Sequence, residues 1–164
     1  LLLSVFESGF PMFFSQNRTG FLGQTYILFK IRTMRLNAEE KNAKWAEVND
    51  SRVTKTGSFL RKWRIDEIPQ FWNVIKGEMS IVGPRPERPE FQERLIKKVP
   101  HWNCRHLVKP GLTGWAQVKF RYASDMESSE EKLAYDLYYI KHASILMDIQ
   151  IILSTLRSLA KGSR

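Results

Sequence analysis

The chain has 164 residues and carries 26 Lys and Arg against 17 Asp and Glu, which gives a formal net charge of +9. This length predicts one domain with a real core, and the 43% hydrophobic and 12% aromatic content excludes a disordered chain. The single cysteine, Cys104, excludes an internal disulfide, and the lack of a CxxC spacing argues against a zinc site.

The N-terminal half predicts a hairpin and then an interrupted helix. Residues 1–14 are apolar and aromatic, which favours either the tail of a longer segment or an ordinary buried strand or helix end. Residues 24–34 predict a strand, or the second arm of a hairpin that turns at residues 20–23. Residues 37–50 are polar and predict a solvated helix or loop. Residues 57–76 predict a helix, but Pro69 lies inside it and indicates a break or the start of a second helix near Asp66.

The C-terminal half predicts two loops and two helical regions. Residues 77–86 contain too many Gly and Pro for a regular element, and residues 87–98 predict a charged helix. Residues 108–115 predict a turn-rich loop leading into a strand-like segment at residues 116–118. Residues 129–159 have the clearest helical periodicity, with one apolar stripe formed by Ile145, Ile149, Ile152, Leu156 and Leu159. Such a stripe suits a core-packing helix as well as a helix on a membrane surface.

Positive charge is concentrated in residues 18–64, which hold eleven Lys and Arg against four Asp and Glu. This excess predicts an anionic partner, which can be nucleic acid, an anionic membrane leaflet or a phosphorylated small substrate. A merely solvated basic surface explains poorly why Arg32 lies in a predicted strand and Arg85 between two prolines. The sequence has no RNP-like pattern, no clear helix-turn-helix, no P-loop and no GxGxxG, so the common nucleic-acid and nucleotide motifs are excluded.

Two adjacent carboxylates, Asp66 and Glu67, follow the cations Arg61, Lys62 and Arg64. An isolated Asp-Glu pair is more often a helix cap with salt bridges than a chemical site. The chemical alternative is that both carboxylates stay ionised beside the cations, one attacking phosphorus and the other binding a hard cation. Adjacent residues on a helix point about 100° apart, which suits two separate tasks better than one shared proton.

Five segments of the chain form a wider pattern: residues 15–20, 29–34, 65–86, 109–118 and 135–141. Together they resemble the bacterial sugar transferases, the monotopic polyprenol-phosphate phosphoglycosyl transferases that start exopolysaccharide, capsule and O-antigen assembly. The resemblance runs from about residue 9 to the end of the sequence. One such segment is a weak signal, whereas five in the same order are specific.

The resemblance implies a small, helix-rich α/β catalytic domain with a short sheet or hairpin near residues 10–32. It also implies a monotopic, membrane-associated fold in which amphipathic helices near the C-terminus and around residues 58–75 lie along the bilayer. Residues 1–8 are expected to be the end of a truncated re-entrant membrane segment, and residues 9–164 the catalytic domain. The implied location is the cytoplasmic face of the bacterial inner membrane.

The implied reaction is the transfer of a phosphosugar from a UDP-sugar to polyprenol (undecaprenyl) phosphate through a covalent aspartyl-phosphosugar. Asp66 would be the nucleophile, and Glu67 would ligate Mg²⁺. The implied partners are the UDP-sugar, the polyprenol phosphate and an anionic membrane surface, with downstream glycosyltransferases as further candidates and no nucleic acid. The sequence does not specify the sugar.

The resemblance also implies that four basic and two acidic residues belong to the substrate site: Lys30, Arg32, Arg61, Arg85, Asp136 and Asp148. The basic residues would hold phosphates, with Arg85 in a loop associated with nucleotide binding. Two alternatives stay open: a non-catalytic membrane-surface scaffold of the same fold, and a basic nucleic-acid-binding module. The intact Asp66 and Glu67 argue against the scaffold, and strongly salt-dependent DNA binding would favour the nucleic-acid module.

Overall fold

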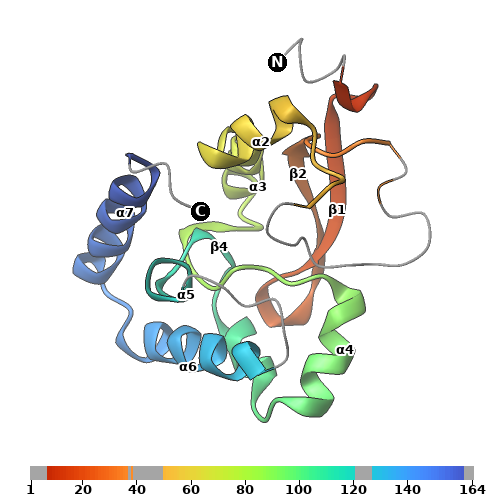
Figure 1. Cartoon of the computed structure of the whole chain (residues 1–164). Helices are drawn as coiled ribbons and strands as arrows, with labels where there is room; N and C mark the ends of the chain where they lie inside the picture. The colour runs from red at the N-terminus through yellow and green to blue at the C-terminus, as the bar shows by residue number, and fades with distance from the viewer. Residues whose placement is uncertain (1–6, 37, 39–49, 121–126, 161–164) are drawn as a thin grey trace.

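The computed structural model describes residues 7–36, 38, 50–120 and 127–160 (Figure 1). Its helices and strands, with η for a 3₁₀-helix, are β1 (Phe13–Thr19), η1 (Phe21–Gly23), β2 (Thr25–Ile31), α2 (Lys55–Lys62), η2 (Ile65–Glu67), α3 (Gln70–Ile75), β3 (Ser80–Val82), α4 (Pro89–Lys98), η3 (Trp102–Leu107), β4 (Gly111–Thr113), α5 (Trp115–Lys119), α6 (Glu127–His142) and α7 (Ile145–Ala160). The described strands form two two-stranded sheets. The expected helix-rich domain with small sheets is confirmed.

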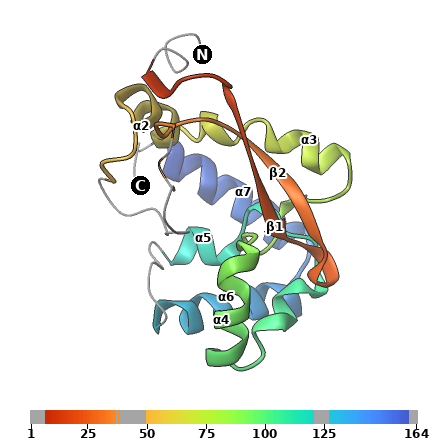
Figure 2. The same cartoon turned by 90° about the vertical axis from the view of Figure 1, so that its right-hand side faces the viewer.

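The predicted hairpin near residues 10–32 is confirmed. β1 pairs antiparallel with β2, from Phe13 opposite Ile31 to Thr19 opposite Thr25, and the connection passes through η1. Gly23 in this connection has φ +78, which favours glycine. In Figures 1 and 2 the hairpin runs the length of one side of the molecule, and α3 lies beside β2.

The predicted interrupted helix forms three pieces: α2, η2 and α3. Thr54 caps α2 by accepting a hydrogen bond from the Gly57 N–H at 2.9 Å. Arg64 has the left-handed φ of +51, which ends the helical path and starts the 3₁₀ turn that carries Asp66 and Glu67. The predicted break near Asp66 is confirmed, since α2 ends at Lys62; Pro69 lies at the start of the next helix, which begins at Gln70.

The prediction that residues 77–86 hold no regular element is wrong, because β3 lies there and pairs parallel with β4. β4 in turn lies in the segment predicted as a loop. The glycines that indicate turns in the sequence are needed here for close approach of two backbones. A Cβ on Gly111 would lie 2.1 Å from the Gly83 nitrogen, and a Cβ on Gly83 would lie 2.4 Å from the Lys109 carbonyl oxygen.

The strand predicted at residues 116–118 is also wrong, since these residues lie in helix α5. Trp115 and Val118, three residues apart, both pack against the core cluster of Val82, Tyr139, Met147 and Ile151, which requires a helical spacing. A second cluster joins α4, η3 and α6 through Phe91, Leu95, Val99, Trp102 and Leu133.

The periodic C-terminal segment forms two helices, α6 and α7, rather than one. α7 packs inward through Met147 and Ile151, with Ile152 partly buried against the same cluster, so the predicted stripe overlaps the core face only in part. Ile145, Ile149 and Leu156 of that stripe are 79%, 48% and 57% exposed.

Among the described helices none combines the length and the apolar character that a membrane crossing requires. The predicted membrane-segment end at residues 1–8 and the polar segment at residues 37–50 fall mostly outside the described residues.

Candidate active site

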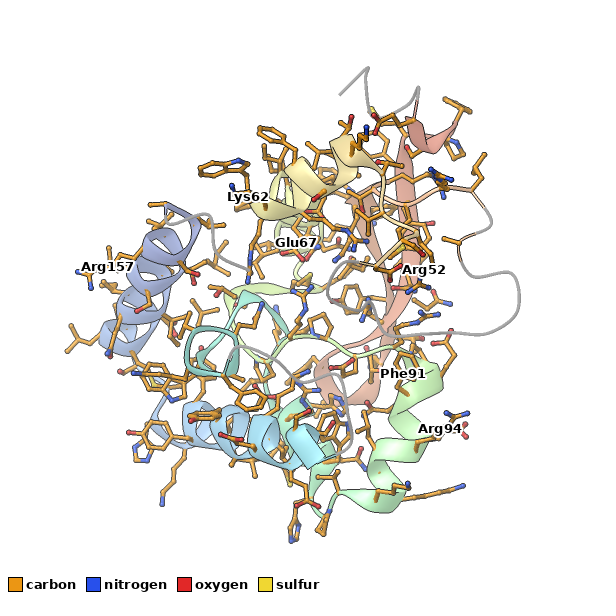
Figure 3. The ribbon with its side chains drawn as sticks, viewed as in Figure 1. Arg52, Lys62, Glu67, Phe91, Arg94 and Arg157 are labelled. Atoms are coloured by element: carbon orange, nitrogen blue, oxygen red, sulfur yellow. The ribbon has the colours of Figure 1, made fainter. Side chains whose placement is uncertain are left out.

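Glu67 lies at the centre of a group of cations supplied by separate parts of the fold. Its Oε1 is 2.8 Å from Arg85 Nη2, in the loop after β3, and 3.2 Å from Lys30 Nζ, on β2. Its Oε2 is 3.9 Å from Arg64 Nη1, at the start of the same turn. The Glu67 side chain is only 11% exposed. Figure 3 shows it pointing from the region below α2 toward the middle of the molecule, whereas Arg94 and Arg157 point outward.

These contacts set the charge state of the group. Burial opposes ionisation of Glu67, but the charges of Arg85, Lys30 and Arg64 outweigh it and hold the pKa of Glu67 well below its usual range. Burial lowers the pKa of Lys30 to about 8, although the negative charge of Glu67 acts in the opposite direction. Glu67 is therefore an anion at neutral pH, and Lys30 is a cation close to its titration point.

Asp66 precedes Glu67 in the same 3₁₀ turn and is 4% exposed. Its negative charge raises the pKa values of both Lys30 and Arg85, so it shares the cations that contact Glu67. The two carboxylates thus lie in one positive environment. Because Asp66 is so little exposed, a phosphorus atom reaches it only when surrounding side chains move.

Asn73 holds this turn against the hairpin. It is 0% exposed, its amide nitrogen donates to the Ile27 carbonyl at 2.7 Å, and its Oδ1 accepts from the Phe29 N–H at 3.3 Å. The same amide nitrogen also donates to Glu78 Oε2 at 2.7 Å. These bonds join α3 to β2, and so place Asp66 and Glu67 beside the strand that carries Lys30.

The other predicted basic residues have different contacts. Arg61 Nε donates to Thr33 Oγ1 at 2.8 Å. Arg32 Nε donates to the Pro11 carbonyl at 2.9 Å, and its guanidinium lies 5.6 Å from the centre of the Phe14 ring. Of the four predicted phosphate-binding residues, the structure brings Lys30 and Arg85 into contact with Glu67.

The two predicted acidic positions contact other groups within the described part of the chain. Asp136 on α6 is 1% exposed, and its Oδ2 lies 2.6 Å from Arg105 Nη2. Asp148 on α7 accepts a hydrogen bond from the Tyr139 hydroxyl at 2.9 Å. Both carboxylates therefore hold neighbouring helices and loops in the described structure.

Arg85 also lines a pocket between the end of β1 and η3. Its lining comes from Thr19, Gly20, Pro84, Arg85, Pro86, Arg105, His106, Val108 and Pro110. Burial and the charge of Arg105 lower the pKa of His106 to about 4, so this imidazole is neutral at pH 7. Arg85 thus lies between the acidic pair and this pocket.

Sequence reasoning missed the roles of Arg64, Asn73 and Arg105 among the site residues. A left-handed φ at Arg64 has no sequence signal, because any residue type can be forced into it by its surroundings. Asn73 lies within residues 65–86, one of the segments that carry the resemblance. Apart from that, the sequence shows only an amide side chain shortly after Pro69, which does not indicate a structural role. Arg105 lies in no motif.

The two carboxylates suit a Mg²⁺ ion that is bound jointly by the protein and its substrate. Within the described ranges, no group of three or more His, Cys, Asp or Glu side chains is arranged to hold a metal ion. Mg²⁺ is commonly bound by one or two carboxylates together with substrate phosphates and water. Such an ion would be held by Glu67 together with the phosphates of a bound substrate.

The family model and the most similar proteins all indicate the same family. The model of the bacterial sugar transferase family matches residues 1–162. The chain is 43% identical over 156 residues to a UDP-N-acetylgalactosamine-undecaprenyl-phosphate N-acetylgalactosaminephosphotransferase of Aeromonas hydrophila, covering 95% of this chain and 37% of that protein. It is 42% identical over 147 residues to a UDP-glucose:undecaprenyl-phosphate glucose-1-phosphate transferase of Escherichia coli, covering 88% and 32%.

A third relative, an uncharacterized sugar transferase of Bacillus subtilis, is 41% identical over 150 residues, which covers 91% of this chain and 70% of that protein. The chain thus spans about a third of the length of the first two relatives. Those two are named for different sugars at nearly equal identity, so overall identity does not select the sugar.

Proposed function

Since the chain belongs to the bacterial sugar transferase family, we propose that it transfers a phosphosugar from a UDP-sugar to undecaprenyl or another polyprenol phosphate. This step would initiate exopolysaccharide, capsule or O-antigen assembly, with downstream glycosyltransferases acting on its product. The observation that carries the proposal is the pair Asp66 and Glu67 within the positive charge of Lys30, Arg64 and Arg85. Such a site suits a substrate with a diphosphate.

The proposed reaction has two steps, each exchanging one P–O bond for another. A carboxylate oxygen of Asp66 attacks the sugar-proximal phosphorus of the UDP-sugar, the bond from that phosphorus to the UMP oxygen breaks, and UMP leaves with the bonding pair. A phosphate oxygen of the polyprenol phosphate then attacks the same phosphorus. The bond to Asp66 breaks, its carboxylate is regenerated, and polyprenyl diphosphate-sugar is formed.

The cations of the site have the task of binding the diphosphate in this scheme. Its oxygens would compete with Glu67 for Lys30 and Arg85, both of which contact Glu67 in the free protein. Glu67 would then be available to hold Mg²⁺, which supplies further neutralisation of the diphosphate charge. Phosphoryl transfer depends mainly on such positioning and neutralisation, and this chain provides both.

The test is an assay of UMP release by the full-length protein in lipid vesicles, with a panel of UDP-sugars and Mg²⁺. Without polyprenol phosphate we expect at most about one UMP per protein, and with it continuous release, as a covalent intermediate requires. Binding to vesicles without UMP release from any sugar would favour the non-catalytic scaffold. Steeply salt-dependent DNA binding without UMP release would favour the nucleic-acid module.

The pKa of Lys30 predicts the alkaline limit of this activity. Lys30 is cationic below about pH 8 and neutral above it, because burial lowers its pKa to that value. We therefore expect kcat/KM for UMP release to fall as the pH rises through about 8, since the neutral amine no longer attracts phosphate. In Lys30→Arg the fall should move to higher pH, and the exposed Lys97→Arg should keep the original profile. An unchanged profile in Lys30→Arg would exclude Lys30 as the titrating group.

Association with the anionic cytoplasmic face of the bacterial inner membrane is part of the proposal. The turn region of α2 and α3 exposes a set of large apolar side chains, which we call the aromatic face: Phe59, Trp63, Ile68, Phe71, Trp72 and Ile75, all 41–76% exposed. Lys62 lies 6.0 Å from the Trp63 ring centre, so a cation accompanies these side chains. Aromatic and apolar side chains beside lysines favour insertion into the interface of an anionic bilayer.

Removing part of the aromatic face should weaken vesicle binding. The combined change Phe71→Ser and Trp72→Ser removes two side chains that are 51% and 55% exposed, and we expect the affinity for phosphatidylglycerol vesicles to fall at least about tenfold in co-sedimentation. Ile96→Ser on α4, 43% exposed outside this face, is the matched control and should bind like the wild type. Equal losses in both variants would contradict a specific role of the aromatic face.

A further inference from the structure

The loop that carries Arg85 cannot hold itself in place by its own hydrogen bonds. Arg85 lies between Pro84 and Pro86, which have no N–H, and α4 begins directly after the loop at Pro89. Its carbonyls accept instead from donors outside the loop: Pro84 from Gly111 N at 3.0 Å, Arg85 from Arg105 Nη2 at 2.9 Å, Pro86 from Arg18 Nη1 at 3.0 Å, and Glu87 from Thr19 N at 2.9 Å. Side chains of two arginines thus bind consecutive carbonyls.

Arg105 is buried and Arg18 is half-buried, which is costly for a guanidinium unless acceptors or anions offset the lost hydration. Arg105 is 2% exposed, its Nη2 is shared between Asp136 and the Arg85 carbonyl, and its guanidinium lies 4.4 Å from the Trp102 ring centre. Burial lowers the pKa of Arg18 to about 10, and its Nη2 donates to Gln16 at 2.7 Å.

The cations around Arg105 face carboxylates of the chain itself. Glu87 lies 4.0 Å from Arg105 Nη1 and also pairs with Lys132, while Asp136 pairs with Arg105. The charge of Arg18 also acts on Glu87. Because these cations already have carboxylate partners within the fold, the group has the composition of a structural support for the loop rather than of a phosphate-binding site.

We propose that Arg105, held by Asp136 and assisted by Arg18, is a positioning residue that directs Arg85 toward Glu67. The proposal rests on the proposed function. Because Arg85 precedes a proline, its backbone is restricted to extended conformations, and a fixed carbonyl then fixes the direction of its side chain. The Arg85 guanidinium meets Glu67 at 2.8 Å, so Arg105 acts on the acidic pair through Arg85.

The test removes the contact of Arg105 with the loop while keeping the interior packed. Arg105→Met alone leaves Asp136 without its partner, so the change is combined with Asp136→Leu, because replacing a buried ion pair by apolar side chains is often tolerated. In UMP release by the full-length protein in vesicles, we expect kcat/KM to fall about 10- to 100-fold. In a protein that already carries Arg85→Ala, the same double change should lower kcat/KM by less than about twofold, because the effect of Arg105 is transmitted through Arg85.

An equal fold-loss in both backgrounds would overturn the proposal, because a purely structural role lowers activity whether or not Arg85 is present. Arg18→Lys should show the same dependence on Arg85 to a smaller extent. The exposed Arg94→Lys on α4 controls for loss of a guanidinium and should leave kcat/KM unchanged in either background.

A second measurement separates this proposal from the proposed function. If the wild type releases no UMP, the proposed function fails, whereas the loop contact can still be tested by hydrogen exchange. The Gly111 N–H donates to the Pro84 carbonyl, and the Arg105→Met/Asp136→Leu protein should exchange it at least about tenfold faster than the wild type. An unchanged exchange rate would show that Arg105 does not hold the loop.

Discussion

Asp66→Asn should abolish UMP release from a UDP-sugar, with a rate at least about 10³-fold below that of the wild type. The amide has nearly the size of the carboxylate but no anionic oxygen to attack phosphorus, so the first step of the proposed reaction is lost. Asp66 is 4% exposed in a turn fixed between α2 and α3, and a nucleophile in such a position has no nearby substitute that keeps the same geometry.

The measurement pairs UMP release with intact-protein mass spectrometry after mixing with a UDP-sugar in the absence of polyprenol phosphate. The wild type should gain the mass of one phosphosugar and Asp66→Asn should gain none. Glu93→Gln, which removes an exposed carboxylate on α4, is the control and should keep both the adduct and the turnover. Full turnover by Asp66→Asn would exclude it as the nucleophile, and melting near the wild-type temperature would exclude unfolding as the cause of a loss.

The sequence predicted those parts of the fold that local patterns determine. The hairpin follows from β-branched and aromatic residues beside glycines, and the helix start after Pro69 follows from the fixed φ and missing N–H of proline, which suit the first turn of a helix. β3 and β4 were missed because their pairing joins residues about 30 positions apart, and because Gly83 and Gly111 indicate turns unless the facing backbone is known.

The stripe on α7 shows a related limit. Periodicity indicates a helix with an apolar side, but it does not say which side meets the core when most of the helix is apolar. Ile151, 0% exposed, was not in the predicted stripe, whereas Ile145, 79% exposed, was. The choice depends on Val82 and Tyr139, which come from other parts of the chain.

Three residues predicted for the site, Lys30, Arg85 and Glu67, lie in contact although they come from β2, a proline-rich loop and η2, while their roles in binding and catalysis stay predictions. Arg105 could not be found from the sequence, because its importance arises only where its side chain meets Asp136 and the Arg85 carbonyl. A contact between a side chain and a distant backbone carbonyl produces no recognisable pattern of residues in the sequence.

Glu67→Gln has the second large expected effect, and it acts on charge rather than on bond formation. The change removes the anion that faces Lys30, Arg64 and Arg85 and leaves three cations close together. Loss of one partner of a buried ion pair costs about 3–5 kcal/mol, so we expect a lower free energy of unfolding in urea titration. Glu90→Gln, which changes a side chain that is itself 55% exposed, should change the free energy of unfolding by at most about 1 kcal/mol.

The activity of Glu67→Gln should fall at least about 10²-fold, and the Mg²⁺ concentration for half-maximal UMP release should rise. If only the stability falls while the Mg²⁺ dependence stays as in the wild type, Glu67 holds the cations but not the metal. This outcome would leave the ion-pair role intact and remove the metal role, so the two tasks of Glu67 can be measured separately.

Glu67 and Lys30 are also coupled through the pH profile. The charge of Glu67 raises the pKa of Lys30 against burial, which lowers it to about 8. Without that charge the pKa of Lys30 must fall further, because burial remains and the neighbouring Arg85 also lowers it. The residual activity of Glu67→Gln should therefore begin to fall at a lower pH than that of the wild type. Because Arg does not lose its proton in this range, adding Lys30→Arg should remove that shift, whereas a shift that persists would mean that Glu67 acts on another titrating group.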